Sequence, residues 1–231
     1  MPRIPDDLRI YAIGDIHGRA DLLAEMLAAI AADQRQRPAL AETRLVFLGD
    51  YIDRGPASKQ VVELLETRIP KGCRPIFLKG NHEDMLLKAL ISPAGLEIWL
   101  ANGGEATLRS YGIHRHHASS SEIAEAFGTH WHFFDSLALT HEAGDYLFVH
   151  AGIRPNVALG AQRPNDLLWI RHDFLGHAGD LGRIVVHGHT PASEPEVRTN
   201  RIGIDTGAWM TGALTAIRLE GEDRAFLSTG R

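Results

Sequence analysis

This chain of 231 residues contains five short polar motifs that include glycine. Four of the five directly follow an apolar, β-rich run. Such motifs lie where strands end and loops begin, and in a layered α/β fold these ends converge on one edge of the sheet. We therefore expect the five motifs to form one site. They are Gly14-Asp15-Ile16-His17-Gly18, Gly49-Asp50-Tyr51-Ile52-Asp53-Arg54-Gly55, Gly80-Asn81-His82-Glu83, His150-Ala151-Gly152 and His187-Gly188-His189-Thr190-Pro191.

The first third of the chain repeats one arrangement three times. An apolar run at 8–13 precedes apolar residues at helical spacing in 20–33, and the same order recurs in 45–48 with 61–65 and in 75–78 with 85–91. Three such strand-loop-helix units predict a layered α/β sheet.

Residues 83–135 are mostly helical in pattern and predict a helical cap beside the site, with a mobile polar loop at 114–121. After residue 135 short apolar runs recur between glycine turns, at 146–149, 184–186, 202–204, 213–219 and 225–227. They predict a second sheet packed on the first. The expected fold is α/β (α+β), with two packed mixed β-sheets flanked by helices, in one domain that spans 1–231 and carries the cap as an insertion.

Charge and hydropathy exclude several classes of protein. The net charge is −5 and no Lys/Arg run occurs, so neither nucleic acid nor an anionic membrane is an expected partner. No apolar stretch approaches the ~20 residues that span a bilayer. Because the first seven residues also lack the apolar core of a secretion signal, the expected location is the cytoplasm. Oligomeric state is left open.

The lone cysteine, Cys73, excludes an internal disulfide. A cysteine phosphatase needs an arginine soon after the nucleophile to hold phosphate. Arg74 is too close, and the position six residues on is Lys79, so that mechanism is set aside.

The polar residues of the motifs are donors for hard or borderline divalent cations. Asp15 and His17 lie two residues apart between glycines and can turn toward one ion. Asp50 has two carboxylate oxygens and can bridge this ion and a second one. Asn81, His150 and His189 would complete the second ion. Two ions at ~3.5 to 4 Å would lower the pKa of a bridging water, so that hydroxide attacks phosphorus in line.

Neighbouring residues supply what phosphoryl transfer needs besides metal, namely a charge clamp and a proton for the leaving group. Arg54 can hold phosphate oxygens as a bidentate donor. His82 can protonate the departing alkoxide, with Asp53 fixing its orientation and raising its pKa.

The five motifs resemble those of the phosphoprotein-phosphatase branch of the calcineurin-like metallophosphoesterases, and the chain is most similar to bacterial and bacteriophage lambda-type serine/threonine phosphatases. The resemblance spans roughly residues 10–214 and includes Asn102-Gly103-Gly104, Trp169-Ile170-Arg171 and Ile204-Asp205-Thr206-Gly207-Ala208. It implies the metallophosphatase sandwich and the metal ligands named above, with Mn²⁺ as the expected ion and Fe²⁺ or Zn²⁺ as alternatives. Arg171 would join Arg54 as a phosphate clamp, with Asn81 also at the substrate. Arg154, near His150, is the alternative second clamp.

The leading expectation is a metal-dependent phosphomonoesterase for phosphoserine and phosphothreonine in proteins, with phosphotyrosine and small aryl phosphates as further substrates. The alternative is a symmetrical diadenosine tetraphosphate hydrolase, a similar family whose second motif usually lacks the counterpart of Asp53. A non-catalytic scaffold of the same fold is the third hypothesis, although it would not need every ligand and the His82 acid. Single residues have simpler interpretations: His187 as a structural neighbour of His189, and Trp99, Trp131 and Trp209 as packing residues.

Overall fold

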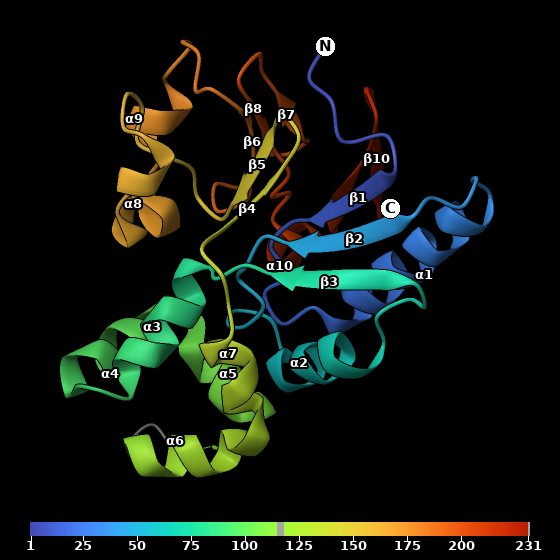
Figure 1. Ribbon diagram of the computed structural model, residues 1–231. Coiled ribbons are helices and arrows are strands. Elements are labelled where there is room, and N and C mark those ends of the chain that lie inside the picture. The colour runs from blue at the N-terminus through green and yellow to red at the C-terminus, as the bar shows by residue number, and fades with distance from the viewer. Residues whose placement is uncertain (115–117, 231) are drawn as a thin grey trace.

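Two five-stranded mixed sheets form the centre of the molecule (Figure 1). The structure is a computed structural model that describes residues 1–114 and 118–230. The first sheet has the order β10-β9-β1-β2-β3, and the second has the order β4-β5-β6-β8-β7. The strands are β1 (Leu8–Ile13), β2 (Glu42–Phe47), β3 (Cys73–Phe77), β4 (Thr140–Ala143), β5 (Tyr146–Val149), β6 (Ile184–His187), β7 (Glu196–Val197), β8 (Arg201–Gly203), β9 (Thr215–Glu220) and β10 (Asp223–Ser228).

Parallel pairing brings the ends of successive strands to one edge. In the first sheet β1 pairs with β2 and β2 with β3 in parallel, whereas β9 is antiparallel to both β1 and β10. In the second sheet β5, β6 and β8 are parallel, and β4 and β7 are antiparallel edge strands. The expected fold of two mixed sheets flanked by helices is confirmed.

The core between the sheets follows from two-residue alternation along the strands. In β1, Ile10 and Ala12 face the second sheet and pack with Phe148 and Val186, while Tyr11 and Ile13 belong to the core on the opposite face. Strands buried on both faces need apolar residues at almost every position, as the sequence of β1 provides.

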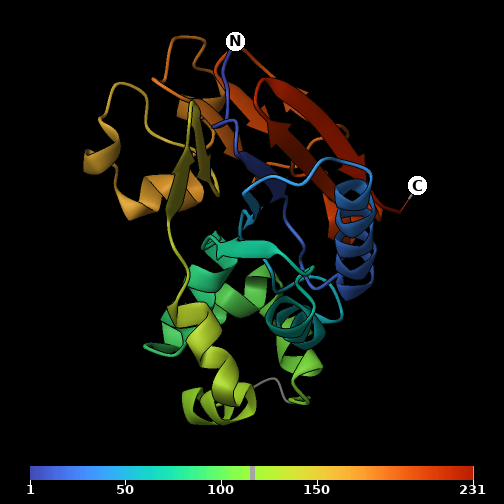
Figure 2. The same ribbon diagram turned by 45° about the vertical axis from the view of Figure 1, so that its right-hand side comes forward.

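Helices cover the outer faces of both sheets, as the two views in Figures 1 and 2 show. Leucine and isoleucine residues of α1 (Ala20–Arg35) and valine residues of α2 (Ser58–Thr67) pack on the first sheet. Residues of α8 (Pro164–Trp169) and α9 (His172–Leu175) pack on the second. Among the described residues, no helix combines the length and the hydrophobicity that crossing a bilayer requires.

The region expected to form a cap is helical, and it lies below the sheets in Figure 1. Its elements are α3 (Asn81–Ala89), α4 (Pro93–Trp99), a π-helical turn (Leu100–Gly104), α5 (Glu105–Ser110), α6 (Ser120–Phe127), a 3₁₀ turn (Gly128–His130) and α7 (Trp131–Asp135). The polar loop expected at 114–121 includes residues 115–117, which lie outside the described part of the chain.

Candidate metal centre

The metal-ligating residues expected from the sequence lie together at the strand ends. Loops after β1, β2, β5 and β6 and the start of α3 bring them there, and each is at most 5% exposed. Within the described residues, two sets of three side chains have ligand atoms close enough to hold an ion: His17, Asp50 and His82, and Asp50, His150 and His189. Asp50 belongs to both sets.

One set surrounds Asn81 at the first turn of α3. The Asn81 Oδ1 atom lies 2.8 Å from His150 Nε2 and 2.9 Å from His189 Nδ1. His150 Nδ1 lies 2.9 Å from the carbonyl oxygen of Leu48, which fixes the ring when Nδ1 donates and leaves the lone pair of Nε2 toward Asn81. Two acceptor atoms then face each other, and a cation between them would satisfy both.

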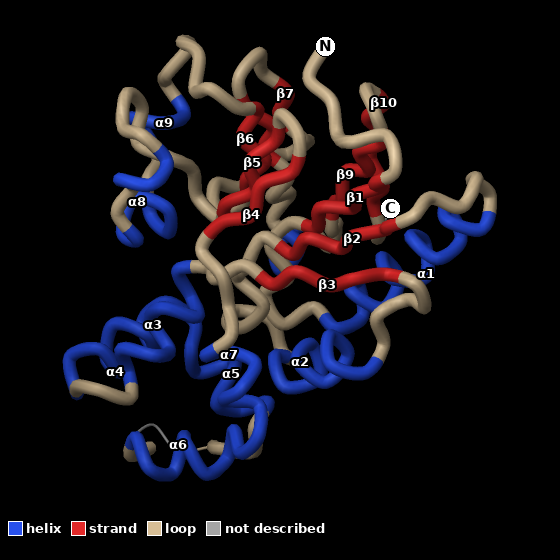
Figure 3. Tube along the Cα trace, in the orientation of Figure 1, coloured by secondary structure: helices blue, strands red, loops and turns tan. Residues whose placement is uncertain are grey.

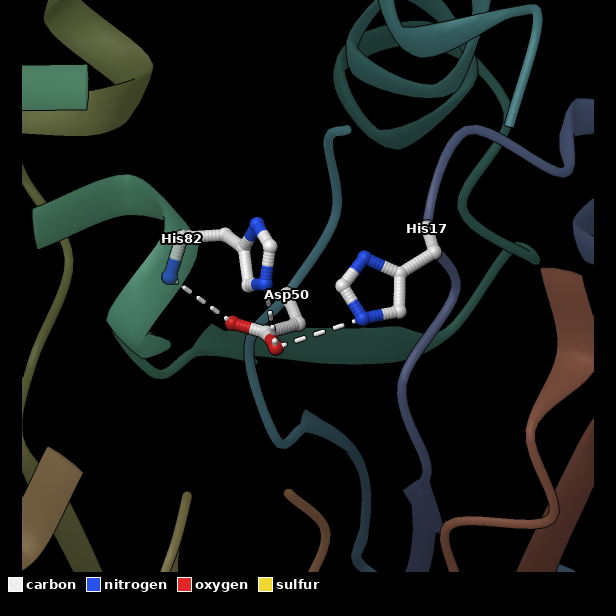
Figure 4. Close-up of side chains that lie close together, drawn as sticks. All are labelled: His17, Asp50 and His82. Atoms are coloured by element: carbon white, nitrogen blue, oxygen red, sulfur yellow. Dashed lines mark hydrogen bonds and ion pairs between the residues drawn. The ribbon is translucent and has the colours of Figure 1, made fainter. Parts of the chain in front are cut away.

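The other set surrounds the second carboxylate oxygen of Asp50, which lies between two imidazole rings (Figure 4). Asp50 Oδ2 is 3.4 Å from His17 Nε2 and 3.9 Å from His82 Nε2. His17 Nδ1 is held by the carbonyl oxygen of Ile52 at 2.8 Å, so that Nε2 is turned toward Asp50. The sequence analysis assigned Asp15 to this set, whereas the set in the structure contains His82 instead.

Asp15 lies nearby, and its surroundings also call for a cation. Its Oδ2 accepts a hydrogen bond from the backbone of His189 at 3.0 Å, but its buried Oδ1 has no hydrogen-bond partner among the described residues. Burial raises the pKa of Asp15 well above its ordinary value, and the charges of Asp205 and Asp50 raise it further. Burial likewise raises the pKa of Asp205 to about 6. Buried carboxylates that raise one another's pKa are stabilised as anions by bound cations.

The three histidines expected as metal ligands, His17, His150 and His189, are kept neutral, which metal binding requires. Burial is the largest cause: it lowers the pKa of His17 to about 3 and the pKa of His189 to about 2, and it lowers the pKa of His150 as well. Their lone pairs are therefore available near neutral pH. Oxygen and imidazole donors without thiolate fit Mn²⁺, Fe²⁺ and Zn²⁺.

The loops that carry the ligands hold strained backbone. Five of the six positive-φ non-glycine residues in the described chain belong to the motifs, with φ of 45° at His17, 51° at Asp50, 71° at Asp53, 67° at Arg54 and 65° at His189. Such conformations persist only where the surroundings enforce them, and they concentrate at functional sites. A Cβ on Gly49 would lie 2.5 Å from the backbone nitrogen of Gly80, so only glycine allows these two loops to approach.

Glu83, to which the sequence analysis gave no role, ties the same two loops together. Its carboxylate accepts hydrogen bonds of 2.9 Å from the backbone N–H groups of Gly80, Asp50 and Tyr51. The Asp50 loop and the start of α3 are thereby fixed to one another. The signal for this role was its place in the Gly80-Asn81-His82-Glu83 motif.

Two arginines contact ligand histidines of different sets. Arg54 Nη1 is 3.1 Å from His17 Nε2, and Arg171 Nε donates to His189 Nε2 at 3.1 Å. Arg154, the alternative clamp, instead forms ion pairs with Asp166 at 2.7 Å and Asp173 at 3.0 Å. The geometry therefore favours Arg54 and Arg171 as the pair available to a phosphate, a role that stays a prediction.

His82 and Asp53 form a buried dyad. His82 Nδ1 lies 2.7 Å from Asp53 Oδ2, and the buried Nε2 has no hydrogen-bond partner among the described residues. Burial by itself lowers the pKa of His82, but the charges of Asp50 and Asp53 and the Asp53 hydrogen bond outweigh it, so the pKa is raised. The ring can therefore carry a proton on the side that faces the cluster.

Cap residues complete this dyad, and the sequence analysis did not assign them to the site. Trp99 Nε1 donates to Asp53 Oδ2 at 2.8 Å, and Thr107 Oγ1 donates to Asp53 Oδ1 at 2.6 Å. Trp99 is fully buried, as expected of a packing residue, but it is also a hydrogen-bond donor. His187 packs against Phe174 and belongs to neither ligand set. Trp209 is 40% exposed, so the expectation that it is a packing residue was wrong.

Comparison with known proteins identifies the family. The family model described as calcineurin-like phosphoesterase matches residues 8–212, which includes all five motifs. The chain belongs to the calcineurin-like phosphoesterase family. The expected family is thus confirmed, and the buried cluster is a His/Asp site able to bind two metal ions in a calcineurin-like phosphoesterase.

Individual relatives of this calcineurin-like phosphoesterase carry different names. A protein of Halalkalibacterium halodurans named bis(5'-nucleosyl)-tetraphosphatase PrpE [asymmetrical] is 27% identical over 224 residues, 89% of this chain and 88% of that one. A solved structure of a putative diadenosine tetraphosphatase aligns over 99% of this chain and 96% of the other, with 21% identity and a TM-score of 0.63. A Saccharomyces cerevisiae serine/threonine phosphatase with similarity to human PP5 aligns over 98% and 81%, with 16% identity and a TM-score of 0.61.

Proposed function

We propose that the protein is a metal-dependent phosphomonoesterase that hydrolyses phosphoserine and phosphothreonine in proteins, with phosphotyrosine and small aryl phosphates as further substrates. The observation that carries the proposal is the buried His82–Asp53 dyad beside the metal cluster. An alkoxide leaving group must gain a proton as it departs, and a positioned histidine supplies one. A nucleotide leaving group departs without a proton from the enzyme, because the second pKa of its phosphate is about 6.

The residues of the chain then have separate tasks. Asp15, His17, Asp50, Asn81, His150 and His189 would hold two divalent ions, and these ions supply Lewis-acid activation of the attacking water. Arg54 and Arg171, which contact His17 and His189, would hold the phosphate oxygens as planar donors. Asn81 would also contact the substrate. His82 gives the proton on Nε2 to the leaving oxygen, and Asp53 stabilises the ring charge through Nδ1.

For the metal we propose Mn²⁺, with Fe²⁺ or Zn²⁺ as alternatives. Carboxylate and amide oxygens favour Mn²⁺, while the imidazoles accept all three ions. The side chains of both ligand sets are buried, which suits tightly held ions. The physiological partner under this proposal is a phosphorylated protein or small phosphoester.

Hydrolysis of dinucleoside tetraphosphates is the second candidate. The named relatives of similar length support it, since the Halalkalibacterium protein matches over 89% of this chain. That name specifies asymmetrical cleavage, which gives a nucleoside monophosphate and a triphosphate, rather than the symmetrical cleavage expected as the alternative. Asp53, with its hydrogen bonds to His82, Trp99 and Thr107, favours the monoesterase over the symmetrical hydrolase.

Substrate profiling of the purified protein with added Mn²⁺ tests the proposal. Phosphate release from a phosphoserine peptide that exceeds turnover of diadenosine tetraphosphate in kcat/KM is the expected result. Faster turnover of the dinucleotide would transfer the assignment to the second candidate, and chromatography would then separate ATP plus AMP from two ADP. No turnover of either substrate or of an aryl phosphate, with metal bound, would refute an enzymatic function.

A further inference from the structure

Trp209 is the exposed tryptophan of this protein. All four tryptophans lie in the described residues, and Trp99 is fully buried while Trp131 and Trp169 are half-buried. Trp209 is 40% exposed, and the next residue, Met210, is 62% exposed. Both belong to the short helix α10 (Ala208–Thr211). Two adjacent large apolar side chains in water call for an explanation when they border a reaction site.

The side chain of Arg54 connects Trp209 to the metal centre. The guanidinium carbon of Arg54 lies over the Trp209 ring, 5.5 Å from its centroid, and Arg54 Nη1 is 3.1 Å from His17 Nε2. A single guanidinium group thus separates the ring from a predicted metal ligand. A phosphate held by Arg54 would place its substituent close to Trp209.

The platform is held rigidly, as Figure 3 helps to locate: α10, which is labelled in Figure 1, lies among the loops near the ends of β1 and β2. Thr211 Oγ1 donates to the carbonyl oxygen of Thr206 at 2.8 Å, and Arg19 Nη1 donates to the carbonyl oxygen of Ala208 at 2.9 Å. A short helix that is already held in place loses little conformational entropy when a ring binds to it.

We infer that the Trp209 ring forms an aromatic-binding platform that strengthens the binding of phosphoesters with a planar ring near the attacked phosphate. The inference rests on the proposed phosphoesterase function and adds a substrate class to it. Stacking on an aromatic side chain suits either a purine base or the phenyl ring of phosphotyrosine, because both present a π face. An aliphatic phosphoester has no ring to place there.

Substitutions separate ring recognition from positioning of Arg54. For the variant Trp209→Leu we expect kcat/KM on ring-bearing substrates to fall about 5- to 100-fold more than kcat/KM on glycerol 2-phosphate, which corresponds to the loss of one stacked ring. Trp209→Phe, which keeps a ring, should recover most of the preference. Phe226→Leu is the matched control, since Phe226 is 44% exposed on β10.

Two pairs of substrates identify the ring. A phosphotyrosine peptide is compared with a phosphoserine peptide of the same sequence, and diadenosine tetraphosphate is compared with glycerol 2-phosphate. A selective loss on either ring-bearing substrate supports the platform and names its source. Equal losses on ring-bearing and aliphatic substrates would overturn it, because they would mean that Trp209 acts only on Arg54.

Binding without turnover provides an independent measurement. In metal-stripped protein, AMP and phenyl phosphate should quench tryptophan fluorescence more than glycerol 2-phosphate does, and this difference should disappear in Trp209→Phe. A difference that persists in the variant would locate ring binding elsewhere and refute the inference. If the native protein hydrolyses no phosphoester, the proposed function fails, whereas the fluorescence result still decides for or against the platform.

Discussion

Replacing Asp53 by asparagine should slow the hydrolysis of esters with poor leaving groups while sparing esters with good ones. Asp53 is fully buried and accepts from Trp99 and Thr107 as well as from His82. Asparagine keeps the shape and an acceptor oxygen for Trp99 and His82, and its amide can donate to the Thr107 hydroxyl. The substitution therefore removes mainly the negative charge beside the imidazole.

The size of the effect follows from the hydrogen bond that changes. A hydrogen bond to a charged group contributes about 1.5–3 kcal/mol and a neutral one about 0.5–1.5 kcal/mol, so the charge is worth about 1–1.5 kcal/mol. This difference corresponds to about a 5- to 13-fold lower rate. His82→Asn removes the proton donor itself and should cost about 10²- to 10⁴-fold.

The assay is kcat/KM at saturating Mn²⁺ for a phosphoserine peptide and for p-nitrophenyl phosphate, with bound metal measured in every variant. We expect the nitrophenyl ester to lose much less, because its phenolate departs with little proton transfer. A variant that combines Asp53→Asn with His82→Asn should be no slower than His82→Asn alone, since Asp53 acts through His82. Equal losses on the two substrates, with metal content unchanged, would refute the proton-donor role.

Three further substitutions test the metal centre, the clamps and the fold. Asp50→Asn should abolish turnover and weaken binding of both ions in a calorimetric titration, unlike the exposed control Asp135→Asn; retained turnover would contradict the shared-ligand role. Arg171→Gln should raise KM for phosphoesters at least tenfold by loss of a charged donor, and Arg154→Gln should not; the reverse order would make Arg154 the clamp. Asp33→Asn should lower the free energy of unfolding in urea by about 1–3 kcal/mol at pH 7, a difference that should shrink as the pH falls below about 3.9.

The sign of this pH dependence follows from the surroundings of Asp33. Burial alone raises its pKa, but hydrogen bonds from Tyr11 and Arg37 and the charge of Arg218 lower it on balance. A carboxylate with a lowered pKa stabilises the fold above its unfolded pKa of about 3.9 and loses this contribution as pH falls through the folded value. An undiminished difference at pH 3 would contradict the argument.

Strands with a nearly continuous apolar run could be located from the sequence, and strands without one could not. The run expected at 8–13 is β1, and the run expected at 146–149 is β5. The strand β4 reads Thr-His-Glu-Ala and is an edge strand, so it needs few apolar residues, and β7 has only two residues. Such edge strands form because a neighbouring strand offers hydrogen bonds, which is a property of the tertiary structure.

The same distinction holds for the site. Its motif residues carry local signals, since glycines and strand ends place them at one edge. Thr107 and Trp99 lie 54 and 46 residues beyond Asp53, inside helices whose sequence gives no sign of that contact. Trp209 lies after a recognised motif, but sequence alone does not show whether a tryptophan is buried or exposed.

The contacts of Asp53 connect the cap to the proposed proton donor. Both donors to Asp53 other than His82 come from the cap, Trp99 at the end of α4 and Thr107 in α5. The backbone of Arg54 donates to the carbonyl oxygen of Gly103 at 3.2 Å, in the π-helical turn between these helices. A displacement of the cap would therefore disturb the proton donor and a phosphate clamp together. Under the proposed function, the geometry of the cap would therefore influence the leaving-group step.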